Sequence, residues 1–399
     1  MKRTIKITSL AVSAALLLCG CGNTPAPAAD TSADTAAEET SAAPAEESTV
    51  NYGTMRDIPL KDLIAEMKTG WNLGNTLDAP DGETSWGNPV TTPEMIDMIA
   101  QAGFNVIRIP TTWSRHTATD GDYKVDEAWL ARVHEIVDYA FANDMYVILN
   151  THHETEWIRP ATEELDSFMP RFEALWTQIA ESFADYGDHL LFEGLNEPRI
   201  EGGKNEWNGG TKDGRAALNV LNKTFVDTVR ATGGNNAKRA LLITTFAAAV
   251  TDSALKDLEL PEDDRVLVSL HAYTPYGFTY HPKADWEVYE FTEYVAADID
   301  NLFSTIDKYL LSSGRQVIIT EYGSQSKSRP VTEERIDDEN VKWVTYYLGK
   351  AKEYGVPCVW WDNNCYYGSG ERFGLLDRAN LKWYVPQVVE AIGNVYKDQ

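Results

Sequence analysis

Residues 190–198 read LLFEGLNEP, an apolar run that ends in the polar turn Asn196-Glu197-Pro198. A short apolar run bounded by turn residues is typical of a buried β-strand. A glutamate directly after such a strand is costly unless it is paired or takes part in chemistry. The stretch therefore predicts a buried strand whose carboxyl end carries functional groups.

Similar apolar runs recur along the chain and alternate with amphipathic stretches. Their near-continuous apolar character suits a parallel sheet covered by helices. Eight such strands alternating with helices predict a (β/α)8 TIM barrel with long loops. A doubly wound open sheet is the alternative, but no Gly-rich phosphate-binding loop supports it. The candidate strands are residues 69–72, 105–110, 146–150, 190–194, 240–244, 266–270, 316–320 and 357–361.

The stretches between the strands carry helix signals. Asp126 is a suitable N-cap for the first of them, and Gly314 and Gly355 stand where helices would end before strands seven and eight. The predicted helices are residues 126–142, 168–183, 214–231, 292–311 and 339–353.

Polar and aromatic residues cluster at the ends of seven of the eight candidate strands. In a (β/α)8 barrel the carboxyl ends of all strands meet at one face, where active sites are built. A single polar residue there is usually a cap, but a set at most strand ends predicts a site. The residues are Asn72, Arg108, His152-His153-Glu154, Asn196-Glu197, His271 with Tyr273, Glu321 and Trp360-Trp361-Asp362-Asn363.

Glu197 and Glu321 follow strands four and seven, which lie across the barrel mouth from one another. Two opposed carboxyl groups are what glycosidic cleavage needs, since one donates a proton to the leaving oxygen and the other acts at the anomeric carbon. The alternative is a structural role for one or both, for instance as salt-bridge partners of Arg108. Spacing alone leaves both readings open.

Four stretches at these strand ends read GWNLGNTL (70–77), LNEP (195–198), HAYTPY (271–276) and EYG (321–323). In this order they resemble glycoside hydrolase family 5 (cellulase family A), most of all its subfamily 4 endoglucanases and xyloglucanases. The resemblance covers residues 52–395. It implies a (β/α)8 barrel and a retaining, endo-acting β-1,4-glucanase without a cofactor, with cellulose, mixed-linkage β-glucan or xyloglucan as substrate.

The resemblance also implies roles for the catalytic residues. Glu197 would protonate the glycosidic oxygen and later activate water, and Glu321 would form the covalent glycosyl-enzyme. Asn196 would bind the sugar 2-hydroxyl. Arg108 and Tyr273 would orient Glu321 and keep it ionised, which would leave the proton of the pair on Glu197.

Further residues complete the expected set of supporting and substrate-binding groups. The resemblance implies that His152 and His271 hold the acid/base and bind sugar hydroxyls, and that Trp361 stacks under the sugar at the cleavage point. His153 and Asn72 stand beside them and are included in the set.

Two positions depart from the common pattern of the family. Thr320 and Asn364 stand where Gly is frequent, which puts the local loop shape in doubt but not the chemistry. Flat aromatic rings in the predicted loops would line an open cleft, although packing is at least as good an explanation for each ring alone. These rings are Trp86, Trp113, Trp157, Trp207, Tyr276, Phe278, Tyr366 and Tyr367. Trp129 and Trp176 lie within predicted helices and are expected in the core.

The pair His152-His153 raises the question of a metal site. Adjacent side chains on a strand point to opposite faces, so both are not expected to bind one ion. No His-x-His follows the first strand, as it would in a metal-dependent barrel hydrolase. We therefore expect neither a catalytic metal nor a cofactor.

The 399-residue chain carries a formal net charge of −26, with 43% hydrophobic and 24% charged residues. Such an acidic surface repels nucleic acid and anionic membranes but not a neutral polysaccharide. Solubility alone explains the charge equally well. We expect a monomer that binds a β-glucan polysaccharide and no nucleic acid.

The first residues have the features of an export signal. Lys2, Arg3 and Lys6 precede an apolar stretch at residues 7–18 that is too short to span a bilayer. The following Leu-Cys-Gly-Cys resembles a bacterial lipobox and predicts lipidation of Cys21. Ordinary signal cleavage and free secretion is the alternative. The predicted location is extracellular, on the bacterial surface if Cys21 is lipidated.

Three regions follow from these observations. Residues 1–21 are predicted to be a signal peptide with a lipobox. Residues 22–50 contain no Lys, Arg or aromatic residue and predict a disordered acidic linker. Residues 51–399 are predicted to form the catalytic barrel.

Two other functions remain open at this point. A mannanase or xylanase would use the same framework. A non-catalytic glycan-binding lipoprotein would also keep the barrel, but it would be expected to have lost part of the glutamate pair and its partners.

Overall fold

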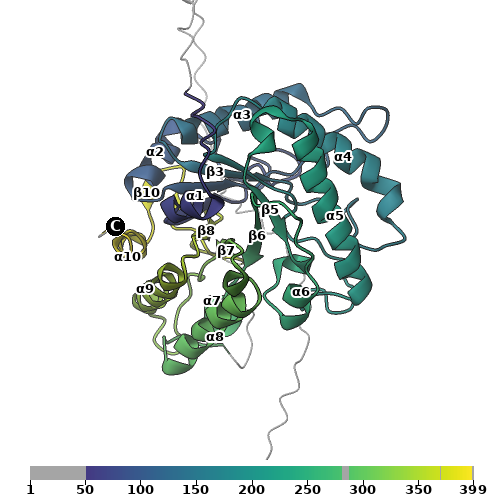
Figure 1. Cartoon of the computed structure of the whole chain (residues 1–399). Helices are drawn as coiled ribbons and strands as arrows, with labels where there is room; N and C mark the ends of the chain where they lie inside the picture. The colour runs from purple at the N-terminus through teal and green to yellow at the C-terminus, as the bar shows by residue number, and fades with distance from the viewer. Residues whose placement is uncertain (1–50, 281–286, 369, 398–399) are drawn as a thin grey trace, which may run out of the picture.

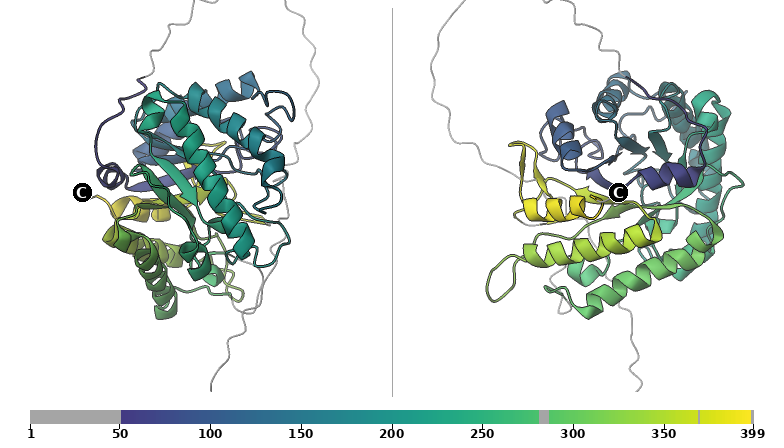
Figure 2. Two further views of the ribbon diagram at one scale, coloured as in Figure 1. Left: turned by 45° about the vertical axis from the view of Figure 1, so that its right-hand side comes forward. Right: turned by 60° about the vertical axis from the view of Figure 1, so that its left-hand side comes forward.

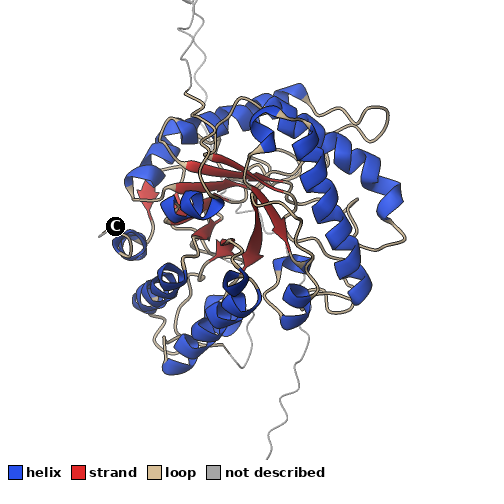
Figure 3. Cartoon of the chain, in the orientation of Figure 1, coloured by secondary structure: helices blue, strands red, loops and turns tan. Residues whose placement is uncertain are grey.

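The computed structural model describes residues 51–280, 287–368 and 370–397. The predicted signal peptide, lipobox and linker lie outside the described residues. In the described part, eight parallel strands form a closed barrel in the order β1 to β8, with β8 paired to β1. Helices surround the strands on the outside (Figures 1 and 3). The predicted (β/α)8 fold is confirmed, and the open doubly wound sheet is excluded.

The barrel strands lie where the sequence places them, with ends shifted by at most two residues. They are β1 (Thr69–Leu73), β2 (Val106–Ile109), β3 (Tyr146–Asn150), β4 (Leu190–Glu193), β5 (Leu241–Thr244), β6 (Val266–His271), β7 (Val317–Tyr322) and β8 (Cys358–Asp362). The main difference is in β7, which continues beyond Glu321. The pairing of β7 with β8 changes register between Ile319 and Tyr322. Such irregularities re-aim side chains near active sites, and this one lies at Glu321.

The helices of the outer layer include all five predicted stretches. The side chain of Asp126 accepts the N–H of Trp129 and caps α3, and Gly355 ends α9 in the left-handed conformation. The short helices were not predicted because they contain too few turns to show a period. The bounds are α1 (Leu60–Glu66), α2 (Pro93–Gln101), α3 (Glu127–Phe141), α4 (Leu165–Ser182), α5 (Lys212–Ala231), α6 (Asp252–Lys256), α7 (Tyr276–Thr279), α8 (Glu293–Tyr309), α9 (Asp337–Tyr354) and α10 (Pro386–Asn394), with 3-10 turns η1 (Gly234–Ala237), η2 (Phe246–Ala248) and η3 (Leu311–Ser313).

Outside the barrel, the strands pack against the apolar faces of the helices. The longest helices cover neighbouring sectors, and Figure 2 shows α8 and α9 side by side. Trp129 and Trp176 belong to this layer, as expected. Within the described residues, no helix is long and apolar enough to cross a membrane.

The inside of the barrel is filled in layers, because alternate side chains of each strand point inward. At the N-terminal end the inward residues are apolar and pack against α1, which closes this end of the barrel. We call this set the lower layer: Val106, Ile148, Leu191, Leu242, Leu267, Ile318 and Val359, with Leu63 and Ile64 of α1.

Two residues further along each strand, the inward positions become mostly polar. We call this set the upper layer: Asn72, Arg108, Asn150, Glu193, Thr244, Ser269, Thr320 and Trp361. These side chains are all less than 9% exposed. The interior of the barrel therefore changes from apolar to mostly polar over two residues along each strand.

A small hairpin closes the C-terminal rim. Strands β9 (Leu376–Asp377) and β10 (Lys382–Trp383) pair antiparallel. Arg378, directly after β9, donates to the carbonyl oxygens of Gly74 (2.9 Å) and Asp362 (2.7 Å). This arginine joins the loops that follow the first and last barrel strands.

Candidate active site

Arg108 is the centre of the polar network at the C-terminal end of the barrel. Its guanidinium donates from Nε to Glu193 Oε2 (2.7 Å), from Nη1 to Glu321 Oε1 (2.8 Å) and Asn72 Oδ1 (3.0 Å), and from Nη2 to Asn196 Oδ1 (2.7 Å). The side chain is fully buried. Asn72 also donates to the carbonyl of Thr320 (2.9 Å), so its role is to hold the strands and Arg108.

Glu197 and Glu321 face one another, as the sequence predicts. An oxygen of each carboxyl group and a ring nitrogen of His271 all lie within 4.8 Å of one another. Glu321 also accepts the hydroxyl of Tyr273 at 2.9 Å. The Glu197 side chain is 20% exposed and the Glu321 side chain 8%. The more accessible group can reach both a leaving oxygen and water, and the deeper one is held by Arg108 and Tyr273.

His271 bonds to the more accessible glutamate. Its Nδ1 lies 2.8 Å from Glu197 Oε1 and 3.5 Å from Glu321 Oε2. Arg199 Nη1 lies 3.8 Å from Glu197 Oε2, and the Arg199 guanidinium stacks on Trp207. Glu197 thus faces two basic groups.

The three central groups titrate as a set because they lie so close together. Burial raises the pKa of Glu321, and the charge of Glu197 adds to this, while His271 and Arg108 oppose it. Burial also acts on Glu197, but the hydrogen bond and charge of His271 outweigh it and lower its pKa. The two carboxylates together raise the pKa of His271 in spite of its burial.

These directions differ from the expectation that Arg108 and Tyr273 would leave the proton on Glu197. The pKa of Glu197 is lowered and that of His271 is raised. The sequence did not show that His271 would bond to Glu197 at 2.8 Å. The hydrogen bond between Glu197 and His271 therefore joins a carboxyl group whose pKa is lowered to an imidazole whose pKa is raised.

His152 stacks on Trp361, and its ring also contacts that of His153. The rings of His152 and Trp361 are parallel, with centroids 5.7 Å apart. A Cβ on Gly74 would lie 2.9 Å from the Trp361 ring and 2.7 Å from the Asp362 carbonyl, so only glycine fits in the GWNLGNTL motif there. His153 is half-buried, and its ring centroid lies 5.6 Å from that of Trp86.

The expectation that the rings of His152 and His153 point apart is wrong. Both residues come after the end of β3, where strand alternation no longer applies, and their ring centroids lie 4.5 Å apart. Asp78 lies close enough to both rings to make them a candidate metal-ligand set.

The hydrogen bonds in this set do not fit a metal. Both Asp78 oxygens accept backbone N–H groups, from Asn75 at 2.9 Å and Thr76 at 2.6 Å. Asn150 accepts the N–H of Thr111 through Oδ1, which turns its NH₂ toward His152 Nδ1 at 3.2 Å. The His152 proton is then on Nε2, where it can donate to a sugar hydroxyl but blocks metal binding.

Within the described residues, one other set of groups converges in this way: Glu197, His271 and Glu321. A cation there would have to compete with Arg108, which already bonds to Glu321 at 2.8 Å. The site residues therefore give no reason to place a metal or cofactor.

Several buried residues of the site were missed by sequence reasoning. The most prominent are Glu193, Asn150 and Ser269, which belong to the upper layer. The missed signal is the two-residue step from an inward apolar residue to an inward polar one on the same strand. Arg199 and Asp78 are also buried and were missed, as was the exposed Glu371, which accepts the Tyr280 hydroxyl at 2.9 Å.

The two departures from the family pattern have clear structural settings. Asn364 has a φ of 61°, in the left-handed region that glycine adopts most easily and asparagine tolerates. Thr320 is fully buried and its hydroxyl lies 2.5 Å from that of Ser269.

The loop aromatics divide into two groups. Trp113, Phe278 and Tyr366 are buried and serve packing. Tyr276 is 40% exposed and Tyr367 65% exposed, and Trp86, Trp157 and Trp207 are half-buried. The second group contains the rings that remain candidates for sugar contacts.

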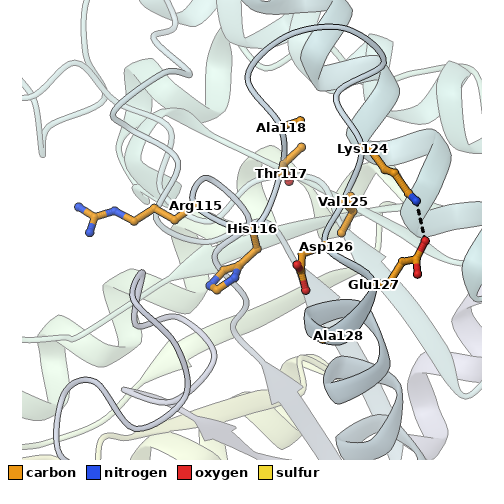
Figure 4. Close-up of a pocket in the computed structure, with 9 residues that line it drawn as sticks. All are labelled: Arg115, His116, Thr117, Ala118, Lys124, Val125, Asp126, Glu127 and Ala128. Carbon is orange, nitrogen blue, oxygen red and sulfur yellow. Dashed lines mark hydrogen bonds and ion pairs between the residues drawn. The ribbon is translucent and has the colours of Figure 1, made fainter.

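A separate hollow lies before α3, between residues 115–118 and 124–128 (Figure 4). Its lining includes the helix cap Asp126 and the pair Lys124–Glu127. None of the central catalytic groups lines it. It is distinct from the glutamate pair, and its charged residues have structural partners, since Arg115 pairs with Asp81, Lys124 with Glu127, and Asp126 caps α3.

A (β/α)8 barrel with two opposed glutamates, a shared arginine and a stacked histidine–tryptophan pair beside them defines a glycoside hydrolase. Residues 72–366 match the family described as cellulase, glycosyl hydrolase family 5. The chain belongs to this family and is an enzyme of the endo-β-1,4-glucanase type.

Individual relatives agree with this assignment. The chain is 48% identical over 346 residues to endoglucanase A of Ruminococcus albus, covering 85% of this chain and 93% of that one. It superposes with a TM-score of 0.81 on a subfamily 4 broad-specificity endoglucanase from Clostridium acetobutylicum, at 41% identity over 85% of this chain and 100% of the other. A xyloglucan-specific endo-β-1,4-glucanase from a metagenomic library, solved with cellotriose, gives 0.79 at 45% identity, covering 84% and 98%.

Proposed function

We propose that the enzyme cleaves β-1,4-glucans with retention of configuration, with Glu321 as nucleophile and Glu197 as acid/base. The observation that carries this proposal is the approach of their carboxyl oxygens to within 4.8 Å. Retention uses carboxyl groups about 5–5.5 Å apart, whereas inversion needs about 6.5–9.5 Å to admit a water.

In the first step, a Glu321 oxygen bonds to the anomeric carbon as the bond to the leaving oxygen breaks. The leaving oxygen takes a proton from Glu197, which can be resupplied from His271 through their 2.8 Å hydrogen bond. In the second step, Glu197 takes a proton from water, and the water oxygen displaces Glu321. Asn196 has its Oδ1 occupied by Arg108, which leaves its NH₂ to donate to the sugar 2-hydroxyl.

Two variants test these roles. Glu321→Ala should lose activity on every substrate. Glu197→Ala should still form the intermediate on an aryl glycoside whose leaving group needs no proton, and azide should speed its breakdown. A β-azide product from Glu197→Ala would support Glu197 as acid/base, because azide then opens the covalent intermediate. An α-azide product from Glu321→Ala would support Glu321 as nucleophile, because azide then takes its place, but it would say nothing of Glu197. Equal loss on both aryl and polymeric substrates in Glu197→Ala, without azide rescue, would contradict the assignment.

We propose that the substrate is a neutral β-1,4-linked glucan, including mixed-linkage glucan and xyloglucan. Support comes from the broad-specificity and xyloglucan-specific enzymes to which the chain is similar. The test is reducing-sugar release from carboxymethylcellulose, lichenan, xyloglucan, glucomannan and xylan. Higher kcat/KM on xylan or mannan than on every glucan would favour the mannanase or xylanase alternative.

We propose further that Cys21 is lipidated and anchors a monomeric enzyme to the cell surface. The lipobox-like Leu18-Cys19-Gly20-Cys21 motif and the acidic stretch behind it support this. Detergent-phase partitioning of the full chain against Cys21→Ala tests the anchor. If both remain in the aqueous phase, the enzyme is simply secreted.

A further inference from the structure

Glu193 is a third glutamate of the site, and the chemistry above does not use it. It lies on the inward side of β4, two residues after the apolar Leu191, and is fully buried. Arg108 Nε and Asn150 Nδ2 donate to its Oε2 at 2.7 and 2.8 Å, and the Ser269 hydroxyl donates to its Oε1. All these groups donate hydrogen bonds, so Glu193 accepts them as a carboxylate.

Glu193 and Glu321 share one guanidinium. Arg108 contacts Glu193 through Nε and Nη2 and contacts Glu321 through Nη1 at 2.8 Å. Burial would lower the pKa of Arg108, but the charges of the two carboxylates outweigh it and raise it. The positive charge next to Glu321 is therefore divided between two anions.

A second connection runs through hydroxyl groups. Ser269 bonds to Glu193 and also lies 2.5 Å from the hydroxyl of Thr320, the residue directly before Glu321. Glu193 therefore reaches the surroundings of Glu321 both through Arg108 and through β6 and β7.

We infer that Glu193 is a positioning residue that fixes the Arg108 guanidinium and limits how much of its charge stabilises Glu321. An unshared Arg108 would hold Glu321 too firmly as a free anion, and a better stabilised carboxylate is a weaker nucleophile. The inference rests on the proposed role of Glu321 as nucleophile.

Other charged and titratable groups face the same carboxylate and stay constant in the test. Arg108 comes from β2, Glu197 follows β4, His271 and Tyr273 come from the end of β6, and Glu371 lies in the loop after β8. Because none of them is changed, a shift in the titration of Glu321 reports on Glu193.

Glu193→Gln is a charge-only variant. Its Oε1 can still accept from Arg108 and Asn150, and its NH₂ can donate to the Ser269 hydroxyl, which can rotate toward Thr320. Asp188→Asn is a matched control. Asp188 is also a buried carboxylate paired with an arginine, Arg56, at 2.6 Å, but it lies just before β4 at the opposite end of the barrel.

The readout is the rate of covalent inactivation against pH. The reagent is the dinitrophenyl glycoside of cellobiose with fluorine in place of the hydroxyl beside the anomeric carbon. Its leaving group needs no proton, so the acidic limb of the profile follows the protonation that stops Glu321 from attacking, within the set of groups that titrate with it. In Glu193→Gln we expect this limb to move to lower pH by roughly 0.5 to 1 unit, since a like charge is removed and Arg108 acts on Glu321 alone. The plateau rate should fall roughly tenfold.

Ser269→Ala is a second variant, for which the acidic limb should move in the opposite direction. It removes a donor from Glu193, so Glu193 competes more strongly for Arg108, and the acidic limb should move to higher pH. This variant keeps every charge and decides the question if Glu193→Gln does not fold. Asp188→Asn should leave the limb in place.

If Glu193→Gln folds and its acidic limb stays in place or moves to higher pH, the inference is overturned. If Glu193→Gln does not fold, an unmoved acidic limb in Ser269→Ala overturns it. Mass spectrometry of the inactivated wild-type enzyme distinguishes a failure of this inference from a failure of the proposed function, because it identifies the labelled residue. A label on a residue other than Glu321 contradicts the assigned nucleophile, whereas a label on Glu321 with an unmoved limb contradicts only the role of Glu193.

Discussion

The lower and upper layers of the barrel interior are built by the same strands but have opposite character. Leu191 packs against α1 in the lower layer, and Glu193, two residues later on β4, accepts hydrogen bonds from Arg108 and Asn150. The apolar layer contributes stability by removing surface from water. The upper layer places charges that would be costly anywhere else in the interior. The comparison shows that one strand repeat separates the part that stabilises the fold from the part that reacts.

Removing the shared cation should have the largest effect on activity. Arg108→Met would leave the carboxylates of Glu193 and Glu321 buried without the positive charge that both contact. We expect kcat/KM on lichenan to fall by about 1000-fold or more. The matched control is Arg239→Met. Arg239 is equally buried, but it lies before β5 at the other end of the barrel and donates to carbonyl oxygens, among them Gly187 and Leu190.

Arg239→Met should lower stability and leave the kcat of the folded enzyme close to that of wild type. Burial lowers the pKa of Arg239 to about 9, whereas two carboxylates raise that of Arg108. Similar losses of kcat in the two variants would mean that the ends of the barrel do not differ in the way proposed.

A smaller effect is expected from His271→Gln. The pKa of His271 is raised in the fold by Glu321 and Glu197, so its proton is present at low pH and lost as pH rises through the folded value. Without it, the catalytic proton must lie on a carboxylic acid, which releases it at lower pH. The basic limb of kcat/KM should therefore move down, with roughly tenfold less activity at pH 7 to 8. A basic limb in its wild-type place would contradict a role of His271 in holding the catalytic proton.

The lower layer should affect stability and hardly affect catalysis. Leu191→Ala would leave a cavity against α1, with an expected loss of about 2–5 kcal/mol in the free energy of unfolding. At temperatures well below the transition, kcat should stay within about threefold of wild type. Urea denaturation and initial rates measure the two quantities, and a loss of kcat as large as that of Arg108→Met would erase the distinction between the layers.

Chelation should have no effect. Asp78 and His152 are engaged by backbone and amide groups, and Arg108 supplies the cation beside Glu321. Incubation with EDTA should leave kcat and KM unchanged. If EDTA abolished activity and one divalent ion restored it, a bound metal and not only Arg108 would supply the positive charge that catalysis needs.

Much of the fold was predictable because strand order and strand ends are local signals. The apolar runs, the caps Asp126 and Gly355 and the motifs at the strand ends all lie within short stretches. The short helices α1 and α2 escaped prediction because seven and nine residues show too little periodicity.

The contacts inside the site were less predictable because they join distant strands. Glu197 and Glu321 were found by their positions after or near strand ends, but their partners depend on the barrel interior. The bond between His271 and Glu197 spans 74 residues, and that between Arg108 and Glu193 spans 85. Glu193 itself carried a signal, a charge inside an apolar strand, which alternation would have placed beside Arg108.

The anomeric configuration of the first product tests the central claim most directly. Wild-type enzyme is mixed with a cello-oligosaccharide, and proton NMR records the new reducing end before it mutarotates. Carboxyl oxygens within 4.8 Å of one another predict that the β-anomer appears first, because Glu321 is displaced by water after a covalent intermediate. An initial α-anomer would contradict retention and the division of roles between Glu197 and Glu321.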